Sequence, residues 1–180
     1  SHLARSSPKV NQRSGVSVRL SVTNAETLVA NAARRALRAG ETEVVPRVSD
    51  LAALAASTSG KVELDTLDDD GGEVIERLVL AAVLQVFRDR LDMGDLRGLV
   101  EAFEDGRVMH TGEDVTSGEE VALTADVPAL REAVVALVGS DERPGVVASA
   151  VEFVLEGLHL AKRLNKDADR RGTRATYRSR

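Results

Sequence analysis

Hydrophobic residues recur every three or four positions near the start of the chain, and this spacing predicts one long amphipathic helix that ends at about Ala39. Ser17 could cap this helix, but Thr23 with Glu26 three residues later makes the better capping box. Gly40 is then its C-terminal cap. The expected apolar face consists of Leu28, Val29, Ala32, Ala33, Ala36 and Leu37.

The same spacing predicts several further helices. They are expected at 50–58 with Ser49 as the cap, at 73–91, at 94–104, at 128–138, and at 144–166 with Pro144 in the first turn. Residues 61–67 alternate as a short strand does, and 107–123 mix strand and turn signals, so that Val108 is a candidate partner for Val62. We therefore expect a mainly α fold, a multi-helix bundle with a helical extension and room for one small β-ribbon.

The composition narrows the class of protein. Aromatic residues make up only 2% of the chain, so the core must be built from Ala, Val and Leu. The chain contains no cysteine, which excludes disulfides, thiolate metal sites and cysteine catalysis and is compatible with a reducing compartment. No apolar run approaches the roughly 18 residues of a membrane span. We expect a soluble, cytoplasmic protein without a membrane partner.

Charge is unevenly distributed along the chain. Residues 1–47 carry a net charge of +5, residues 48–161 carry −16 and residues 162–180 carry +6. A continuous nucleic-acid groove needs clustered Lys and Arg, so the acidic middle makes nucleic acid an unlikely partner. The polar, basic segment 167–180 is expected to be a disordered tail.

Two ligand-binding motifs are only partly matched by this sequence. Gly60-Lys61 is the only Gly-Lys pair, but Val62 follows it, so it does not form a phosphate-binding P-loop. The loop before residue 73 resembles a calcium loop, yet its first and last ligands would be Leu67 and Leu78.

One metal motif is half present. Glu156 and His159 have the i, i+3 spacing found in di-metal carboxylate bundles, but such a site needs a second copy of the motif. We favour the alternative that Glu152, Glu156, His159 and Arg163 form a polar stripe with helical charge pairing. The metal site remains a weak alternative.

The segment GVSVR, residues 15–19, resembles the G-x-S-x-R motif that opens the helical lid of AAA+ ATPases of the magnesium-chelatase and MoxR type. PRVSDL at 46–51 and AVEFVLEGLHLAKRLNKD at 150–167 are similar to the C-terminal half of magnesium chelatase subunit I-like ATPases. All three segments occur in the same order, so the resemblance covers most of the chain.

This resemblance implies a two-part motor, a P-loop core followed by the lid. The motif arginine of such lids is the sensor 2 residue, which reaches toward the γ-phosphate of ATP. Arg19 takes that position here, and Gly15 supplies the turn before it. Arg13 is a secondary basic candidate without a motif position. Arg34, Arg35 and Arg38 suit the C-terminal end of the first helix as structural or surface residues, with a docking patch as the alternative.

The implied organisation has four parts. Residues 1–14 are a flexible leader with a cloning remnant, 15–60 are lid-like helices, 61–166 are a helical extension and 167–180 are the tail. Because the chain starts without Met, we expect it to be an excised piece of a longer protein.

The resemblance also bears on cofactors, partners and activity. ATP and Mg²⁺ are expected only in the full-length motor, which would form a homo-oligomeric, hexameric ring and act on a partner with a von Willebrand A-type domain. The Walker A, Walker B and arginine-finger residues are missing, so no catalytic residue is assigned and the chain alone is expected to be inactive. The alternative is a non-enzymatic helical interaction module whose basic ends bind an acidic partner or nucleic acid.

Overall fold

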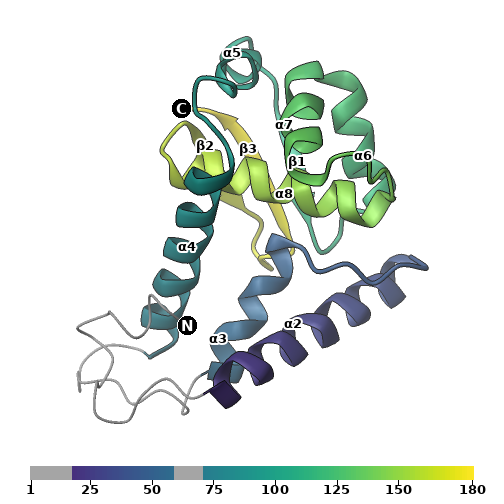
Figure 1. The fold of residues 1–180 in the computed structure, drawn as a ribbon, viewed down its shortest axis with the longest axis vertical. Helices are drawn as coiled ribbons and strands as arrows, with labels where there is room; N and C mark the ends of the chain where they lie inside the picture. The colour runs from purple at the N-terminus through teal and green to yellow at the C-terminus, as the bar shows by residue number, and fades with distance from the viewer. Residues whose placement is uncertain (1–17, 59–70) are drawn as a thin grey trace.

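The computed structural model describes residues 18–58 and 71–180, which form mainly helices with one small antiparallel sheet (Figure 1). The helices are α2 (Val18–Ala39), the 3-10 helix η1 (Val48–Ala52), α3 (Ala53–Thr58), α4 (Gly71–Arg90), α5 (Arg97–Glu104), α6 (Ser117–Asp126), α7 (Pro128–Val138) and α8 (Pro144–Leu160). The strands are β1 (Met109–Gly112), β2 (Leu164–Ala168) and β3 (Arg174–Ser179). The predicted mainly α class with one small β element is confirmed.

Helix α2 starts earlier than its capping box predicted. It already includes Val18, so Thr23 lies inside the helix and the predicted start there is wrong. Leu20 is only 9% exposed, which extends the buried face about two turns toward the N-terminus. At the other end Gly40 has a φ of +68°, the left-handed conformation that glycine adopts without strain, and the predicted C-terminal cap is confirmed.

The buried face of α2 is rotated from the predicted one. Leu37 is 82% exposed and Val29 is 52% exposed, although both belong to the periodic apolar set. Asn31 and Arg35 are buried instead, beside Ala32 and Ala36. Polar partners on the next segment determine this orientation, as the site below shows.

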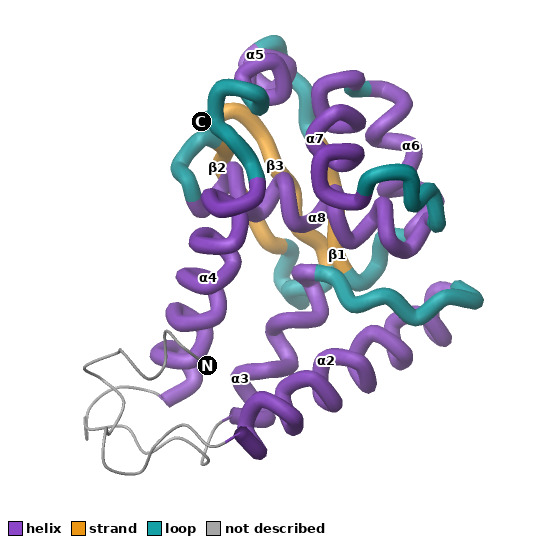
Figure 2. Tube along the Cα trace, in the orientation of Figure 1, coloured by secondary structure: helices purple, strands orange, loops and turns teal. Residues whose placement is uncertain are grey.

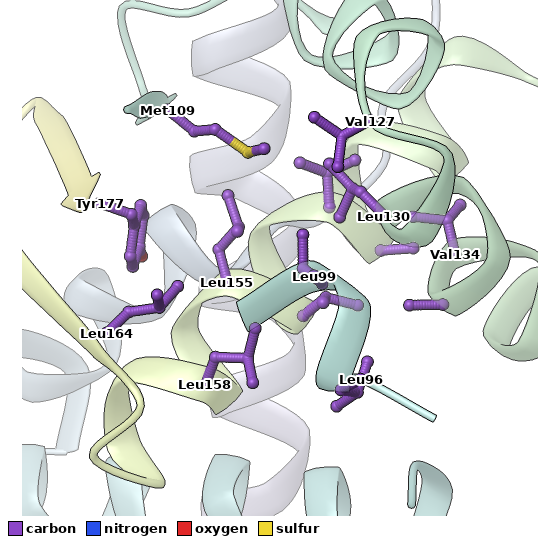
Figure 3. Close-up of a cluster of buried hydrophobic side chains, with 14 of the residues drawn as sticks. Leu96, Leu99, Met109, Val127, Leu130, Val134, Leu155, Leu158, Leu164 and Tyr177 are labelled. Atoms are coloured by element: carbon purple, nitrogen blue, oxygen red, sulfur yellow. The ribbon is translucent and has the colours of Figure 1, made fainter. Parts of the chain in front are cut away.

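Helix α8 lies at the centre of the molecule, with α4, α6 and α7 packed around it and the sheet on another side (Figures 1 and 2). The main hydrophobic core consists of buried residues from α4, α5, α7, α8 and the strands (Figure 3). Gly157 allows α8 to approach α4 closely, because a Cβ there would lie 2.0 Å from Cδ2 of Phe87. Phe87 also meets Phe153 edge to face, with ring centroids 6.1 Å apart.

The predicted course of the C-terminal segment is wrong. Helix α8 ends at Leu160 instead of 166, and the chain reverses at Lys162, whose φ is +61°. The segment expected to be a disordered tail contains β3, which pairs with β1 on one side and with β2 on the other. The predicted boundary between the helical extension and the tail, at 166/167, falls inside β2. Tyr177 and Leu164 are each 2% exposed and complete the core, which is why the tail is ordered.

The region 107–123 was also predicted incorrectly in part. Its strand component is β1, which pairs with β3, with Met109 opposite Tyr177. Val108 therefore lies just outside a strand, and its proposed partner Val62 lies outside the described residues. The remainder is α6, which begins with a capping box between Thr116 and Glu119. Those two residues are a sequence signal that could have predicted α6.

The segment from α2 to α3 packs against the rest of the molecule outside the main hydrophobic core. Among the buried residues of the main core, none comes from 18–58. Between this segment, α4 and α8 lies the apolar cleft, a hollow of about 890 Å³. Its walls include Leu28, Leu54, Ile75, Val79, Val83 and Phe153. In the part of the chain that is described, no helix combines the length and apolarity required to cross a membrane.

Candidate functional site

Arg19 is the second residue of α2 and lies in its first turn. Gly15 and Arg13 lie outside the described residues. The structure therefore locates the backbone of the predicted nucleotide-sensing arginine, while its two companions remain sequence predictions.

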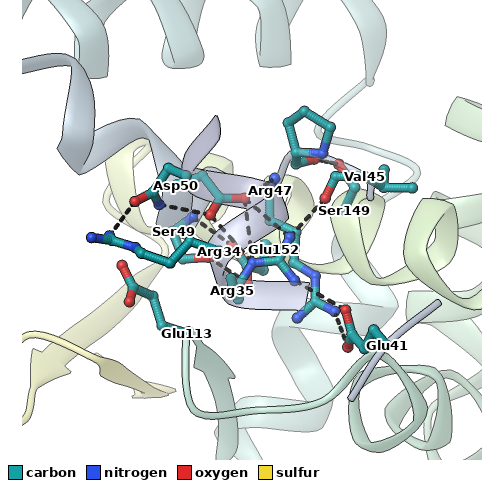
Figure 4. Close-up of polar contacts among 12 residues, drawn as sticks. Arg34, Arg35, Glu41, Val45, Arg47, Ser49, Asp50, Glu113, Ser149 and Glu152 are labelled. Atoms are coloured by element: carbon teal, nitrogen blue, oxygen red, sulfur yellow. Dashed lines mark hydrogen bonds and ion pairs between the residues drawn. The ribbon is translucent and has the colours of Figure 1, made fainter. Parts of the chain in front are cut away.

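Arg35, near the other end of α2, is a buried ion-pair residue (Figure 4). Its Nη2 donates to Oδ2 of Asp50 at 3.1 Å and to the carbonyl of Val45 at 2.7 Å, and its Nη1 donates to Oε2 of Glu41 at 3.2 Å. Asn31 also donates to Asp50, at 2.9 Å. Burial alone would lower the pKa of Arg35, but the hydrogen bond and charge of Asp50 raise it, so the guanidinium stays charged.

Of the structural and surface roles that the sequence left open for the arginines of this helix, Arg35 has the structural one. It is 1% exposed, because Asp50 on η1 supplies a buried carboxylate opposite this face of α2. Arg34 and Arg38 are exposed, as predicted. Arg38 forms an ion pair with Glu113, which precedes α6.

Arg47 extends these contacts to α6. Its side chain is fully buried, donates to the carbonyl of Val115 at 2.9 Å, hydrogen-bonds Ser117 and forms an ion pair with Glu41 at 2.8 Å. Glu41 also accepts a hydrogen bond of 2.6 Å from the backbone of Ser117. Residues 41–50 are therefore held to the first turn of α6 by hydrogen bonds that involve charged groups, which are stronger than neutral ones.

A pair of buried carboxyl groups completes the cluster. Glu152 on α8 accepts from the backbone amide of Ser49 at 2.6 Å and from its hydroxyl at 3.0 Å. Glu120 on α6 has one oxygen, Oε2, that lies 3.6 Å from Nη1 of Arg47 and has no hydrogen-bond partner in the described part of the chain. We call this cluster the buried ionic network; its members are Arg35, Glu41, Arg47, Asp50, Glu120 and Glu152.

Both carboxyl groups of this pair have raised pKa values. Burial and the adjacent charge of Glu152 raise the pKa of Glu120 to about 10, and burial raises the pKa of Glu152 as well. The hydrogen bonds from Ser49 favour the ionised form of Glu152, whereas Glu120 has an oxygen free to carry the proton. Glu120 is therefore neutral at pH 7.

The weak metal alternative at Glu156 and His159 finds no support in the geometry. Oε2 of Glu156 accepts from Lys166 and from the Tyr177 hydroxyl, each at 2.7 Å. The Nδ1 atom of His159 lies 3.1 Å from the carbonyl oxygen of Leu164. Within 18–58 and 71–180, no group of three or more potential ligands occurs.

The favoured polar stripe on α8 is also wrong in part. Glu152 is 2% and Glu156 is 1% exposed, so both face the interior rather than solvent. Burial and the carboxylate of Glu156 raise the pKa of Tyr177 well above its ordinary value, so its hydroxyl stays protonated at neutral pH. Lys166 is held in the ion pair with Glu156. These paired groups stabilise the junction of α8 with the sheet, and none is a free base or nucleophile.

Sequence reasoning did not identify the ionic network. Asp50, Glu120 and Glu152 appear in the sequence as ordinary charged helix residues. The one available signal is Arg47, which follows a proline in the PRVSDL segment and precedes Asp50 by three residues. At this spacing the backbone amide of Arg47 donates a hydrogen bond of 2.8 Å to the Asp50 carboxylate.

Comparison with known proteins gives no match: neither a protein-family model, nor a curated protein, nor a solved structure matches this chain.

Proposed function

We propose that this chain is the helical lid region of an AAA+ ATPase of the magnesium-chelatase type, in which Arg19 contacts the γ-phosphate of bound ATP. The parent motor would bind ATP and Mg²⁺ in its own core, assemble as a homo-oligomeric, hexameric ring in the cytoplasm and remodel a partner with a von Willebrand A-type domain. The chain itself would sense nucleotide and contribute to assembly rather than perform hydrolysis.

One observation carries this proposal. Arg19 of the GVSVR segment lies in the first turn of α2, a helix of 22 residues. The first turn of a helix has unpaired N–H groups and a partial positive charge, which favour anions. A guanidinium stays charged at all relevant pH values and donates two parallel hydrogen bonds to phosphate. An arginine in this turn is therefore well suited to stabilise the charge that develops on the γ-phosphate during transfer.

The proposal is tested by Arg19→Ala in the full-length parent. Loss of a charge-assisted contact made to the transition state is expected to lower kcat about 10²-fold while the protein stays folded. Arg34→Ala is the matched control, because Arg34 is an exposed arginine on the same helix. Steady-state ATPase assays measure both variants, and a normal rate for Arg19→Ala would refute the sensor assignment.

The isolated chain gives a second test. It is expected to show no ATP turnover and at most weak nucleotide binding, because its sequence lacks a P-loop. A phosphate-release assay measures turnover, and titration calorimetry measures binding. ATPase activity that persists through several purification steps would contradict the proposed role as a lid region.

The apolar cleft favours a second candidate function, a non-enzymatic interaction module. Clefts of this size with apolar walls commonly receive a ligand or a partner helix. If the basic ends instead bind nucleic acid, the binding constant must fall steeply with added salt. Salt-dependent binding to a labelled oligonucleotide would support this module, and no binding at low salt would exclude its nucleic-acid form.

A further inference from the structure

The outer face of helix α2 carries large apolar side chains that the described part of the molecule leaves in contact with solvent. With its opposite face the helix packs on η1 and α3, and it lies at the lower edge of the molecule (Figure 1). On the outer face Val22 and Val29 are each 52% exposed, and Leu37 is 82% exposed. Of the seven large hydrophobic side chains that are exposed within 18–58 and 71–180, three therefore lie on this one helix.

These side chains form one continuous row along α2. At 3.6 residues per turn, positions 22, 29, 33 and 37 fall within about 80° of the helix circumference and extend over about 23 Å of its length. Ala33 is half-buried and lies between the exposed Val29 and Leu37. Spacings of seven and four residues are those of a helix that contacts another helix. A single exposed valine is ordinary, whereas a contiguous apolar patch marks an interaction surface.

Two charged residues indicate which partner fits this row. Glu26 lies within it and Arg34 lies beside it, and both are exposed. At 100° per residue, the two positions are on the same side of the centre of the row. A second copy of α2 in parallel orientation brings Glu26 next to Glu26 and Arg34 next to Arg34, which is unfavourable for like charges.

The antiparallel orientation pairs opposite charges instead. A two-fold axis beside Val29 brings together positions whose numbers sum to 59 or 60. Val22 then lies opposite Leu37 of the other copy, and Glu26 lies within one residue of the other copy's Arg34. Arg34 hydrogen-bonds Asn31 in this structure, but a guanidinium has five N–H donors, so it can bind a carboxylate as well. Both the apolar row and the charges are thus self-complementary.

We propose that the outer face of α2 is a homodimer contact, in which α2 of a second copy of this chain packs antiparallel against it. The helix is about 33 Å long and about 10 Å wide, so the face covers roughly 330 Å² in each copy, less than the about 800 Å² of a standard interface. The dimer is therefore weak and depends on concentration. Its contact is isologous and closes on itself, so it is separate from the head-to-tail contacts of a ring and does not rest on the proposed function.

Sedimentation equilibrium of this chain, from about 10 μM to about 1 mM, measures the contact. The average mass of the wild type is expected to rise from 19.2 kDa toward twice that value as the concentration increases. Leu37→Glu places a charge in the row and is expected to weaken association at least about tenfold. Val135→Glu is the matched control, because Val135 is also exposed but lies on α7. A wild type that stays monomeric at all concentrations, or equal weakening by both variants, contradicts the proposal.

A charge exchange tests the antiparallel orientation. Glu26→Arg and Arg34→Glu are each expected to weaken association about tenfold, because each change turns two symmetric ion pairs into like-charge contacts. The double variant restores opposite charges across the axis, so its dissociation constant is expected to return to within about threefold of the wild-type value. Additive weakening in the double variant excludes the antiparallel pairing. All four positions of these tests are exposed, so circular dichroism is expected to show that the variants stay folded.

The homodimer contact and the proposed function can fail separately. Normal ATP hydrolysis by Arg19→Ala in the parent would remove the sensor role but leave the measured dimer in place. A monomeric wild-type chain would remove the dimer but leave the sensor assignment in place. Arg34 contacts no nucleotide in either proposal, so Arg34→Ala remains a control for hydrolysis.

Discussion

Replacing Glu120 with Gln is expected to remove most of the pH dependence of stability between pH 6 and pH 8. In the folded protein the pKa of Glu120 is raised to about 10, because burial and the charge of Glu152 disfavour its ionised form. In the unfolded chain the group ionises near its ordinary value of about 4.3. Between these two values the folded state holds a proton that the unfolded state has released.

The sign and size of the effect follow from this difference. A carboxyl group with a raised pKa in the folded state contributes stability below its unfolded pKa, and the contribution is lost as the pH rises toward the folded pKa. One proton corresponds to about 1.4 kcal/mol per pH unit, so the free energy of unfolding falls by roughly 3 kcal/mol from pH 6 to pH 8. For a chain of this length, that lowers Tm by about 5–10 °C.

The assay is thermal or denaturant unfolding at several pH values in this range. Glu120→Gln places a neutral amide where the neutral carboxyl group lies, so its stability is expected to be nearly independent of pH and to exceed that of the wild type at pH 8. Glu132→Gln, on the exposed surface of α7, is the control and should retain the wild-type slope. If Glu120→Gln shows the same slope as the wild type, the pKa of Glu120 is not raised in the folded protein.

Three further outcomes are expected in unfolding measurements. Gly157→Ala places a Cβ 2.0 Å from the buried Phe87 ring and should destabilise the fold by about 1–3 kcal/mol; unchanged stability would show that the ring can shift. Asp50→Ala leaves Arg35 buried beside only one carboxylate and should lower the free energy of unfolding by about 3–5 kcal/mol. Loss of the exposed Arg97–Glu101 pair, in contrast, should change it by no more than about 1 kcal/mol. Deleting 164–180 removes two strands and Tyr177 from the core and should abolish cooperative unfolding, whereas a dispensable tail would leave Tm unchanged.

Local signals predicted several elements well. Helix α7 begins at Pro128 and α8 at Pro144, and Gly139 follows the end of α7 with a φ of +63°. A proline in the first turn loses no helical hydrogen bond, and glycine adopts the left-handed conformation without strain. Such boundaries depend on the residue itself and its immediate neighbours, so the sequence is sufficient to predict them.

The strands could not be predicted in the same way. β1 spans four residues, and its partner β3 starts more than 60 residues later, so neither forms without the other. The segment 167–180 is polar and basic, and only the placement of Tyr177 against α8 and the pairing on both edges of β3 give it order. Composition alone therefore predicted disorder where long-range pairing supplies the structure.

By itself, the sequence determined the helical class and most long helices with their proline and glycine boundaries. Only the tertiary structure decided which charged residues are buried. Arg47 meets the carbonyl of Val115 across 68 positions, and Ser49 meets Glu152 across 103. Periodicity assigns a charged side chain to the surface, because burial is unfavourable unless a partner is present. Whether that partner is present depends on how distant segments pack.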